Sequence, residues 1–167
     1  MNDESFLLCQ LENDLPKSKQ DNRAEKVALT RSQIMQRVKQ KDSAAELSLR
    51  SSLFNRGLRY RVHRRVEGVL IDIVFVSAKV AVFVDGCFWH GCPIHATFPK
   101  SNQSYWLPKL AENKARDLRQ TAKLSDAGWE VIRAWEHECI PPSGKLVGRV
   151  ERAVRRRSLH GGTRIAR

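Results

Sequence analysis

Residues 69–95, VLIDIVFVSAKVAVFVDGCFWHGCPIH, contain two apolar runs followed by a short segment rich in glycine, cysteine and histidine. Val69–Val76 and Lys79–Asp85 are composed mainly of β-branched and aromatic residues and are separated by turn signals, which predicts two consecutive β-strands. The second run is almost wholly apolar, as in a central strand covered on both faces. We therefore expect these two strands to form the centre of the fold.

Helix and strand signals alternate on both sides of these strands. Ser43-Ala44-Ala45-Glu46 fits a capping box and predicts a helix that ends at Gly57. A strand at Leu58–Val62, a long helix at Ser104–Ala127 and a last strand at Trp129–Trp135 complete the pattern. The order α-βββ-α-β predicts an α/β fold with a mixed β-sheet flanked by helices.

The charge of the chain indicates a polyanionic partner. The 167 residues include 30 Lys+Arg against 18 Asp+Glu, a formal net charge of +12, and 41% hydrophobic residues, enough for one core. Such a basic surplus favours nucleic acid as the partner. The chain has no apolar run of membrane-spanning length, and its N-terminus lacks the features of a signal peptide. We therefore expect a cytoplasmic, nucleoid-associated protein with no membrane partner.

The two ends of the chain differ from the centre. Residues 1–29 are acidic and show little periodicity, which predicts a disordered extension before a domain at residues 30–142. Residues 143–167 are rich in arginine and predict a basic helix and tail, which either grips phosphates or is solvated. His63 lies among arginines and is interpreted as a surface or phosphate-facing side chain.

Cysteine and histidine gather in the segment after the central strands. Cys87, Cys92 and His95 offer two thiolates and an imidazole within nine residues, and tetrahedral zinc needs one ligand more. Either His137 or Cys139, near the end of the last strand, can supply it. A Cys87–Cys92 disulfide is the alternative, but the lack of export features disfavours it. A closed four-ligand site of this kind would be structural.

Carboxylates on the central strands suggest a second, harder metal site. Asp72 interrupts an apolar strand, and a buried carboxylate needs a partner. Asp85 ends the next strand, so the two acids predict a magnesium site at one end of the sheet. Glu46 either reaches this site through water or serves only in the capping box. His90 is a candidate general base, or else it ligates zinc in place of His95.

Three aromatic residues accompany the cysteine segment. Phe88 and Trp89 lie inside it, and Trp106 follows downstream. Adjacent aromatics among polar residues can form a wedge that enters a DNA base stack. The alternative is that one or two of them pack over the zinc loop.

Several blocks of this sequence match one known family in order. The blocks are Thr30-Arg31-Ser32, Met35, Ala45-Glu46, Asp72, Gly86-Cys87-Phe88-Trp89-His90, Tyr105-Trp106, Asn113-Lys114-Ala115-Arg116-Asp117, Gly128-Trp129 and Trp135-Glu136. From about Thr30 to Pro142 the chain resembles the very-short-patch repair (Vsr) DNA mismatch endonucleases. The resemblance implies a restriction-endonuclease-like fold, a structural zinc, and a magnesium-dependent nick 5′ to the thymine of a T·G mismatch left by deamination of 5-methylcytosine.

The resemblance also implies roles for the catalytic candidates. Asp72 corresponds to the magnesium-binding aspartate, and Val84 lies where the family offers a backbone carbonyl to the metal. His90 corresponds to the general base, and Glu46 to the helix glutamate that supports the site.

The DNA-contacting and zinc-binding roles come from the resemblance too. The family's intercalating aromatics correspond to Phe88, Trp89 and Trp106, and Met35 occupies the place of a methionine that acts from the minor-groove side. Cys87 matches a zinc ligand directly, and Cys92 and His95 supply the next two with altered spacing and order.

Two positions depart from the family pattern. Asp85 stands where the best-known members have a second histidine, which either adds a metal ligand or changes the pH dependence. His137 stands where those members have cysteine after the Trp-Glu pair, so we rank it above Cys139 as fourth ligand.

The expected protein is a monomer that acts on double-stranded DNA with a T·G mismatch, with mismatch-repair proteins as further partners. The alternatives are a restriction-type or structure-specific endonuclease of the same fold, and a non-catalytic zinc-stabilised DNA-binding module. The last would leave Asp72, Asp85 and His90 without a role.

Overall fold

The computed structural model describes residues 41–95, 97 and 102–160. The extension at residues 1–29, the segment around Met35 and the end of the tail lie outside this range. The helices and strands are α2 (Ala44–Asn55), β1 (Arg61–Val66), β2 (Val69–Phe75), β3 (Val80–Asp85), α3 (Gln103–Asp126), β4 (Glu130–Trp135), α4 (Glu136–Cys139) and α5 (Gly144–His160).

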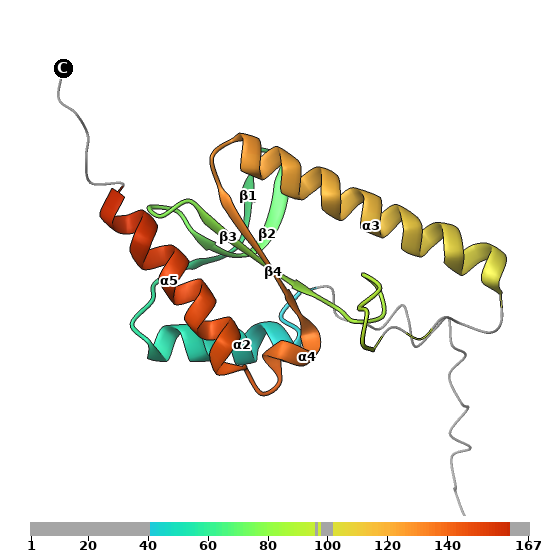
Figure 1. Ribbon diagram of the computed structural model, residues 1–167, viewed down its shortest axis with the longest axis horizontal. Coiled ribbons are helices and arrows are strands. Elements are labelled where there is room, and N and C mark those ends of the chain that lie inside the picture. The colour runs from blue at the N-terminus through green and yellow to red at the C-terminus, as the bar shows by residue number, and fades with distance from the viewer. Residues whose placement is uncertain (1–40, 96, 98–101, 161–167) are drawn as a thin grey trace, which may run out of the picture. The chain divides into compact units, whose positions relative to one another are not determined.

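The strands form one mixed sheet in the order β1-β2-β3-β4 (Figure 1). β1, β2 and β3 pair antiparallel, and β3 and β4 pair parallel. A parallel pair needs a crossover connection, which α3 provides between β3 and β4. The mixed sheet flanked by helices confirms the predicted fold class.

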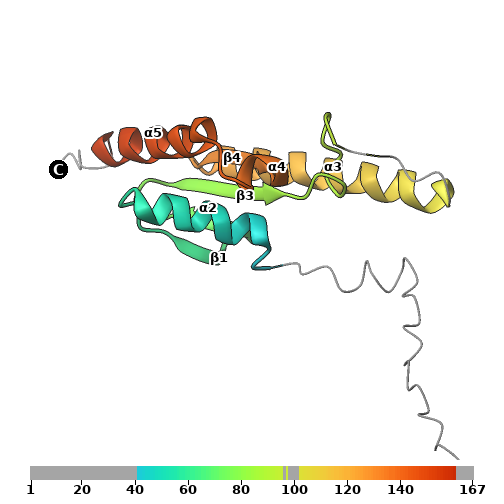
Figure 2. The same cartoon turned by 90° about the horizontal axis from the view of Figure 1, so that it is seen from below.

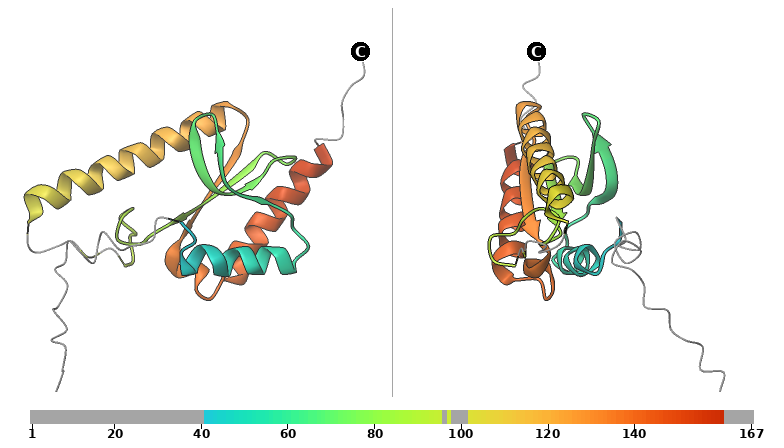
Figure 3. Two further views of the ribbon diagram at one scale, coloured as in Figure 1. Left: turned by 180° about the vertical axis from the view of Figure 1, so that it is seen from behind. Right: turned by 90° about the vertical axis from the view of Figure 1, so that its right-hand side faces the viewer.

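Each face of the sheet is covered by different helices. α2, α4 and α5 cover one face, where Leu49 and Val150 are fully buried with Ile73 and Val82. α3 covers the other face, where Leu124 is fully buried among strand residues. Figures 1 and 3 show this division from opposite sides. The C-terminal helix is therefore part of the core, in addition to being basic.

The first strand lies further along the chain than the sequence predicted. β1 is Arg61–Val66, whereas the prediction was Leu58–Val62. The hairpin turn sets this position, because Glu67 and Gly68 both have positive φ, 50° and 78°, as a two-residue turn between paired strands requires. The strand must reach this turn and so includes the arginines, while Leu58 is only 7% exposed in the core.

Arginines of α5 hold neighbouring backbone. Arg149 donates to the Arg133 carbonyl (2.8 Å), and Arg157 donates to the Ala78 carbonyl (2.7 Å). These two arginines therefore bind the protein's own backbone. Neither predicted alternative for the basic end, phosphate contact or solvation, included this role. Among the described helices, none has the length and apolar character needed to cross a membrane.

Candidate active site

An open pocket of about 280 Å³ lies where β2, β3, the following loop and α3 meet. Both Asp72 and His90 line it, so the two principal catalytic candidates share one cavity. The complete lining is Glu46, Leu70, Asp72, Phe83, Val84, Asp85, His90, Arg116, Asp117, Gln120 and Arg133.

No cationic side chain contacts the Asp72 carboxylate among the residues that the structure describes. Its Oδ2 accepts the Val84 backbone N–H at 2.9 Å, and Oδ1 has no partner among the described residues. Burial raises the pKa of Asp72 from 3.8 to about 6, which the Val84 hydrogen bond opposes and the nearby charges of Glu46 and Asp85 reinforce. A site that disfavours an isolated negative charge in this way is one that a bound cation would relieve.

The raised pKa of Asp72 means that the negative charge of its carboxylate lowers the free energy of unfolding. The folded state binds the proton more tightly than the unfolded state, so this destabilisation is absent below pH 3.8 and complete above about pH 6. We expect Asp72→Asn to raise the free energy of unfolding by about 1–2 kcal/mol at pH 8 in a chelator, and by roughly half as much at pH 5. Urea unfolding at both pH values measures this. Asp126→Asn, at an exposed acid of α3, should change neither value, and an Asp72→Asn protein no more stable than wild type at pH 8 would contradict the assignment.

α3 holds the loop that carries His90. Asp117 is buried, and its Oδ2 lies 2.5 Å from His90 Nδ1. One turn earlier, Asn113 donates to the Trp89 carbonyl at 3.1 Å. Asp117 was not predicted as a site residue, although it ends one of the family blocks and shares a helix face with Asn113. Figure 2 shows this loop, at the end of β3, beside α3.

Asp85, predicted as a magnesium ligand, is paired with an arginine of β4. Nε and Nη2 of Arg133 each lie 2.6 Å from one of its carboxylate oxygens. Asp85 Oδ1 also lies 3.6 Å from His90 Nδ1, and Arg133 Nη2 lies 3.1 Å from Asp117 Oδ1. Asp85 is thus half of a two-pronged ion pair beside the histidine. Arg133 was also missed, because an arginine in a half-buried strand gives no signal of its partner.

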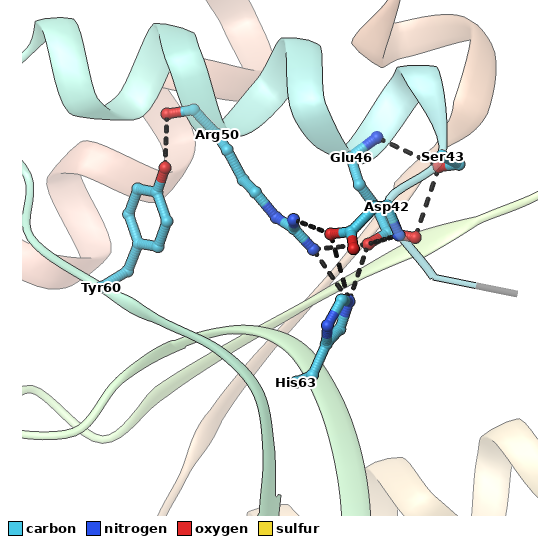
Figure 4. Close-up of polar contacts among 6 residues, drawn as sticks. All are labelled: Asp42, Ser43, Glu46, Arg50, Tyr60 and His63. Carbon is cyan, nitrogen blue, oxygen red and sulfur yellow. Dashed lines mark hydrogen bonds and ion pairs between the residues drawn. The ribbon is translucent and has the colours of Figure 1, made fainter.

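Glu46 lies both in the pocket lining and in the N-terminal cap of α2. It lines the pocket, and its backbone N–H is accepted by Ser43 Oγ at 3.2 Å, as in a helix cap. Its Oε2 lies 2.6 Å from Arg50 Nη2 and 3.1 Å from His63 Nε2. Figure 4 shows these side chains converging, with Asp42 paired to the same arginine.

The interpretation of His63 as a surface or phosphate-facing side chain is wrong. Its side chain is only 16% exposed and contacts both Glu46 and Arg50. Val62 pairs with Ile73 and Arg64 with Ile71, so His63 stands opposite Asp72 in the hairpin. His63 therefore belongs to the environment of the pocket.

The sulfur and imidazole residues form a separate cluster. The ligand atoms of Cys87, Cys92, His95 and His137 all lie within 4.8 Å of one another. His137 Nδ1 is 3.2 Å from Cys87 Sγ and 3.7 Å from Cys92 Sγ, and Cys92 Sγ is 3.9 Å from His95 Nδ1. The cysteines are free thiols, not the alternative disulfide. Cys139 is outside this group, fully buried in the core with its pKa raised to about 12 by burial.

A short helix after the last strand turns His137 toward the loop. The residue lies just beyond the end of β4, as predicted, and the chain there bends into a helix that the sequence did not predict, α4, where Glu138 Oε2 accepts the Trp135 backbone N–H at 2.9 Å. Glu136 Oε2 accepts the Cys87 backbone N–H at 3.3 Å. These bonds join the end of the sheet to the cysteine loop.

The aromatic residues pack on one another. Ring centroids are 5.3 Å apart for Phe88 and Trp89, 5.4 Å for Phe88 and Trp106, and 5.8 Å for Trp89 and Trp106. All three side chains are half-buried. The loop and the start of α3 thus present one compact aromatic group.

Comparisons with known proteins identify relatives. The family described as DNA mismatch endonuclease Vsr matches residues 26–95. The chain is 49% identical over 113 residues to the Type II nicking enzyme V.NaeI of Lentzea aerocolonigenes (65% of this chain, 68% of that protein). It is 34% identical over 109 residues to the DNA mismatch endonuclease Vsr of Escherichia coli K12 (64% and 69%). Among solved structures, the catalytic domain of the homing endonuclease I-Bth0305I matches with a TM-score of 0.47 and 16% identity, over 69% of this chain and 97% of that one.

Sheet, pocket and relatives together define a DNA endonuclease. Within that class, the extent of its identity to these relatives shows that the chain belongs to the Vsr family of DNA mismatch endonucleases.

Proposed function

We propose that this protein nicks one strand of double-stranded DNA on the 5′ side of the thymine in a T·G mismatch, with magnesium as the catalytic ion. The observation that carries the proposal is the pocket shared by Asp72 and His90. The relatives named as nicking enzyme and mismatch endonuclease support the same reaction class.

The acidic side of the pocket fits magnesium. Asp72 has no cationic side-chain partner in the described part of the chain, and Glu46 lines the same cavity. Hard divalent cations prefer such oxygen ligands. We assign Asp72 as the principal ligand, with the backbone carbonyl of Val84 beside it. Magnesium, when bound, supplies charge stabilisation to the phosphate under attack.

His90 is the proposed general base. Asp117 engages Nδ1, which fixes the ring and leaves Nε2 without a partner among the described residues. A histidine oriented in this way can accept a proton from an attacking water through its free nitrogen. Glu46, held by Arg50 and His63, supports the metal side of the pocket.

The second cluster fits zinc in a structural role. Zinc bonds to sulfur and nitrogen in a tetrahedron put the ligand atoms roughly 3.3–3.8 Å apart. Three of the six separations here are 3.2, 3.7 and 3.9 Å, and all six lie within 4.8 Å. We propose Cys87, Cys92, His95 and His137 as the ligands. All four belong to the protein, so the ion would fix the loop and leave no position for substrate.

A pair of substitutions tests this ligand set. We expect wild-type protein to hold one zinc per chain, His137→Ala to lose it on dialysis against a chelator, and Cys139→Ala to keep it, because Cys139 lies outside the cluster. Elemental analysis gives the zinc content directly. Retention of zinc by His137→Ala together with its loss from Cys139→Ala would reverse the ranking of the fourth ligand.

The aromatic group is the proposed mismatch-contacting element. We assign Phe88, Trp89 and Trp106 to insertion beside the mismatched pair, with Met35 acting from the minor-groove side. Aromatic insertion offsets the few kcal/mol that unstacking costs, and the half-buried rings of the loop and of the first turn of α3 support this role.

A nicking assay on defined duplexes tests the proposed function. Duplexes carrying one T·G pair, the matched C·G pair or a different mismatch are incubated with magnesium and with chelator. One nick beside the thymine, only in the T·G duplex with magnesium, is expected. Cutting of fully paired DNA would instead favour a restriction-type enzyme, and binding without cleavage would favour a non-catalytic module.

A further inference from the structure

We propose that Arg133 is a positioning residue for His90 and acts through the carboxylates of Asp85 and Asp117. The inference rests on the proposed function in that His90 is the group positioned for the reaction. The family resemblance assigns no role to Arg133, which enters the site from β4, the strand that pairs parallel with β3.

The Arg133 guanidinium contacts three of the four carboxylate oxygens of Asp85 and Asp117, and His90 contacts the fourth. Arg133 binds both oxygens of Asp85 at 2.6 Å, and its Nη2 lies 3.1 Å from Oδ1 of Asp117. The remaining oxygen of Asp117, Oδ2, lies 2.5 Å from His90 Nδ1. A planar donor fork fixes the geometry of the carboxylates that it engages more strictly than a single ammonium group does.

The contacts of Arg133 determine which carboxylate accepts the hydrogen bond from the His90 imidazole. His90 Nδ1 has two acids near it, Asp117 at 2.5 Å and Asp85 at 3.6 Å. With Arg133 present, Asp85 is satisfied by the guanidinium and Asp117 is the acceptor. Without Arg133, Asp85 would lose its paired cation and would compete with Asp117 for the same N–H, and the ring would lose its single orientation.

The position of Arg133 is itself well determined. Its guanidinium carbon lies 4.8 Å from the centroid of the Phe83 ring, and its backbone carbonyl accepts the Arg149 side chain at 2.8 Å. Of the other charged groups near this set, Arg116 is the nearest, 3.7 Å from Asp117 Oδ1, with a half-exposed side chain. Apart from His90 itself, only Arg133 contacts both acids among the residues that the structure describes.

Single and double substitutions test the proposal with saturating T·G duplex and magnesium. We expect Arg133→Met to lower the rate of nicking about 100-fold, as misplacement of a catalytic group does, with DNA affinity within about threefold of wild type. Removal of the competing charge in the Asp85→Asn/Arg133→Met double variant should recover about tenfold of that loss. Arg133→Lys, which keeps the charge but not the fork, should fall between wild type and Arg133→Met.

Arg59→Met is the matched control, because it removes one arginine and its hydrogen bond to the Phe54 carbonyl at 3.3 Å without touching Arg133 or the acids. It should nick like wild type. Circular dichroism and thermal unfolding establish that each variant is folded. Nicking by Arg133→Met within threefold of wild type, or a double variant as slow as Arg133→Met, would overturn the proposal.

A spectroscopic readout separates this inference from the proposed function. In ¹⁵N-histidine-labelled protein, the hydrogen-bonded Nδ1 proton of His90 should give a downfield signal that Arg133→Met shifts or broadens and the double variant restores. If wild-type protein fails to nick T·G duplexes, the proposed function fails while this signal still tests Arg133. An Nδ1 signal unchanged by Arg133→Met would contradict the positioning role whatever the substrate.

Discussion

Asp72→Asn is expected to lower the rate of T·G nicking by about a thousandfold. A bound divalent ion contributes several kcal/mol of charge stabilisation in phosphodiester cleavage, and about 4 kcal/mol corresponds to a factor of a thousand. Asparagine preserves the size of the side chain and can still accept the Val84 N–H, so the fold should be retained. The same substitution is expected to stabilise the metal-free protein, since it removes a half-buried charge whose pKa is raised to about 6.

Single-turnover nicking across a magnesium titration measures this effect. The rate of Asp72→Asn should not be restored by excess magnesium, and its affinity for T·G duplex should stay close to that of wild type. Asp126→Asn, at an exposed acid of the same protein, serves as the control for loss of one negative charge. An Asp72→Asn enzyme that nicks within tenfold of wild type would mean that another group holds the catalytic ion.

His90→Gln is the second substitution with a large expected effect. General base catalysis contributes typically about 10²–10⁴-fold, and we expect a loss of this size in nicking. Glutamine can still hydrogen-bond to Asp117 but cannot accept the proton of an attacking water at neutral pH. Binding to the T·G duplex should be unchanged, because the aromatic group is supported separately by contacts among its rings.

Zinc content distinguishes the two roles considered for His90. As a base it lies outside the sulfur and imidazole cluster, so His90→Gln should keep one zinc per chain while His95→Gln loses it. Loss of zinc and of mismatch binding from His90→Gln would instead make His90 part of the loop's metal site.

Elements with strong local signals were predicted well from the sequence. The apolar run at residues 80–85 is the buried central strand, and the Ser43–Glu46 cap begins α2 where the capping box indicated. β1 was displaced because its position depends on the two positive φ angles of the hairpin turn and not on the apolarity of the strand. The end of the last strand at Trp135 was predicted, but the helix α4 that carries His137 was not, because a one-turn helix leaves almost no periodic signal.

Residues of the site that act through distant partners were not predictable. Asp117 lies 27 positions from His90, and Arg133 lies 48 positions from Asp85, so only the packing of α3 and β4 brings each pair together. His63 was misinterpreted because its arginine neighbours suggested a solvated strand, whereas the hairpin register turns it toward Asp72 and Glu46. Residue types and spacing indicate which catalytic and metal-binding groups are present. The fold determines which of these groups lie close enough to act together.

The most direct test of the account is to locate the catalytic ion with manganese in place of magnesium. The chain has five histidines, and in histidine-labelled protein their imidazole signals can be assigned one by one with substitutions. Substoichiometric manganese should broaden the His90 signal in wild-type protein, and Asp72→Asn should abolish that broadening. Broadening of His90 that persists in Asp72→Asn, or manganese that broadens other histidines and leaves His90 sharp, would contradict a metal site shared by these two residues.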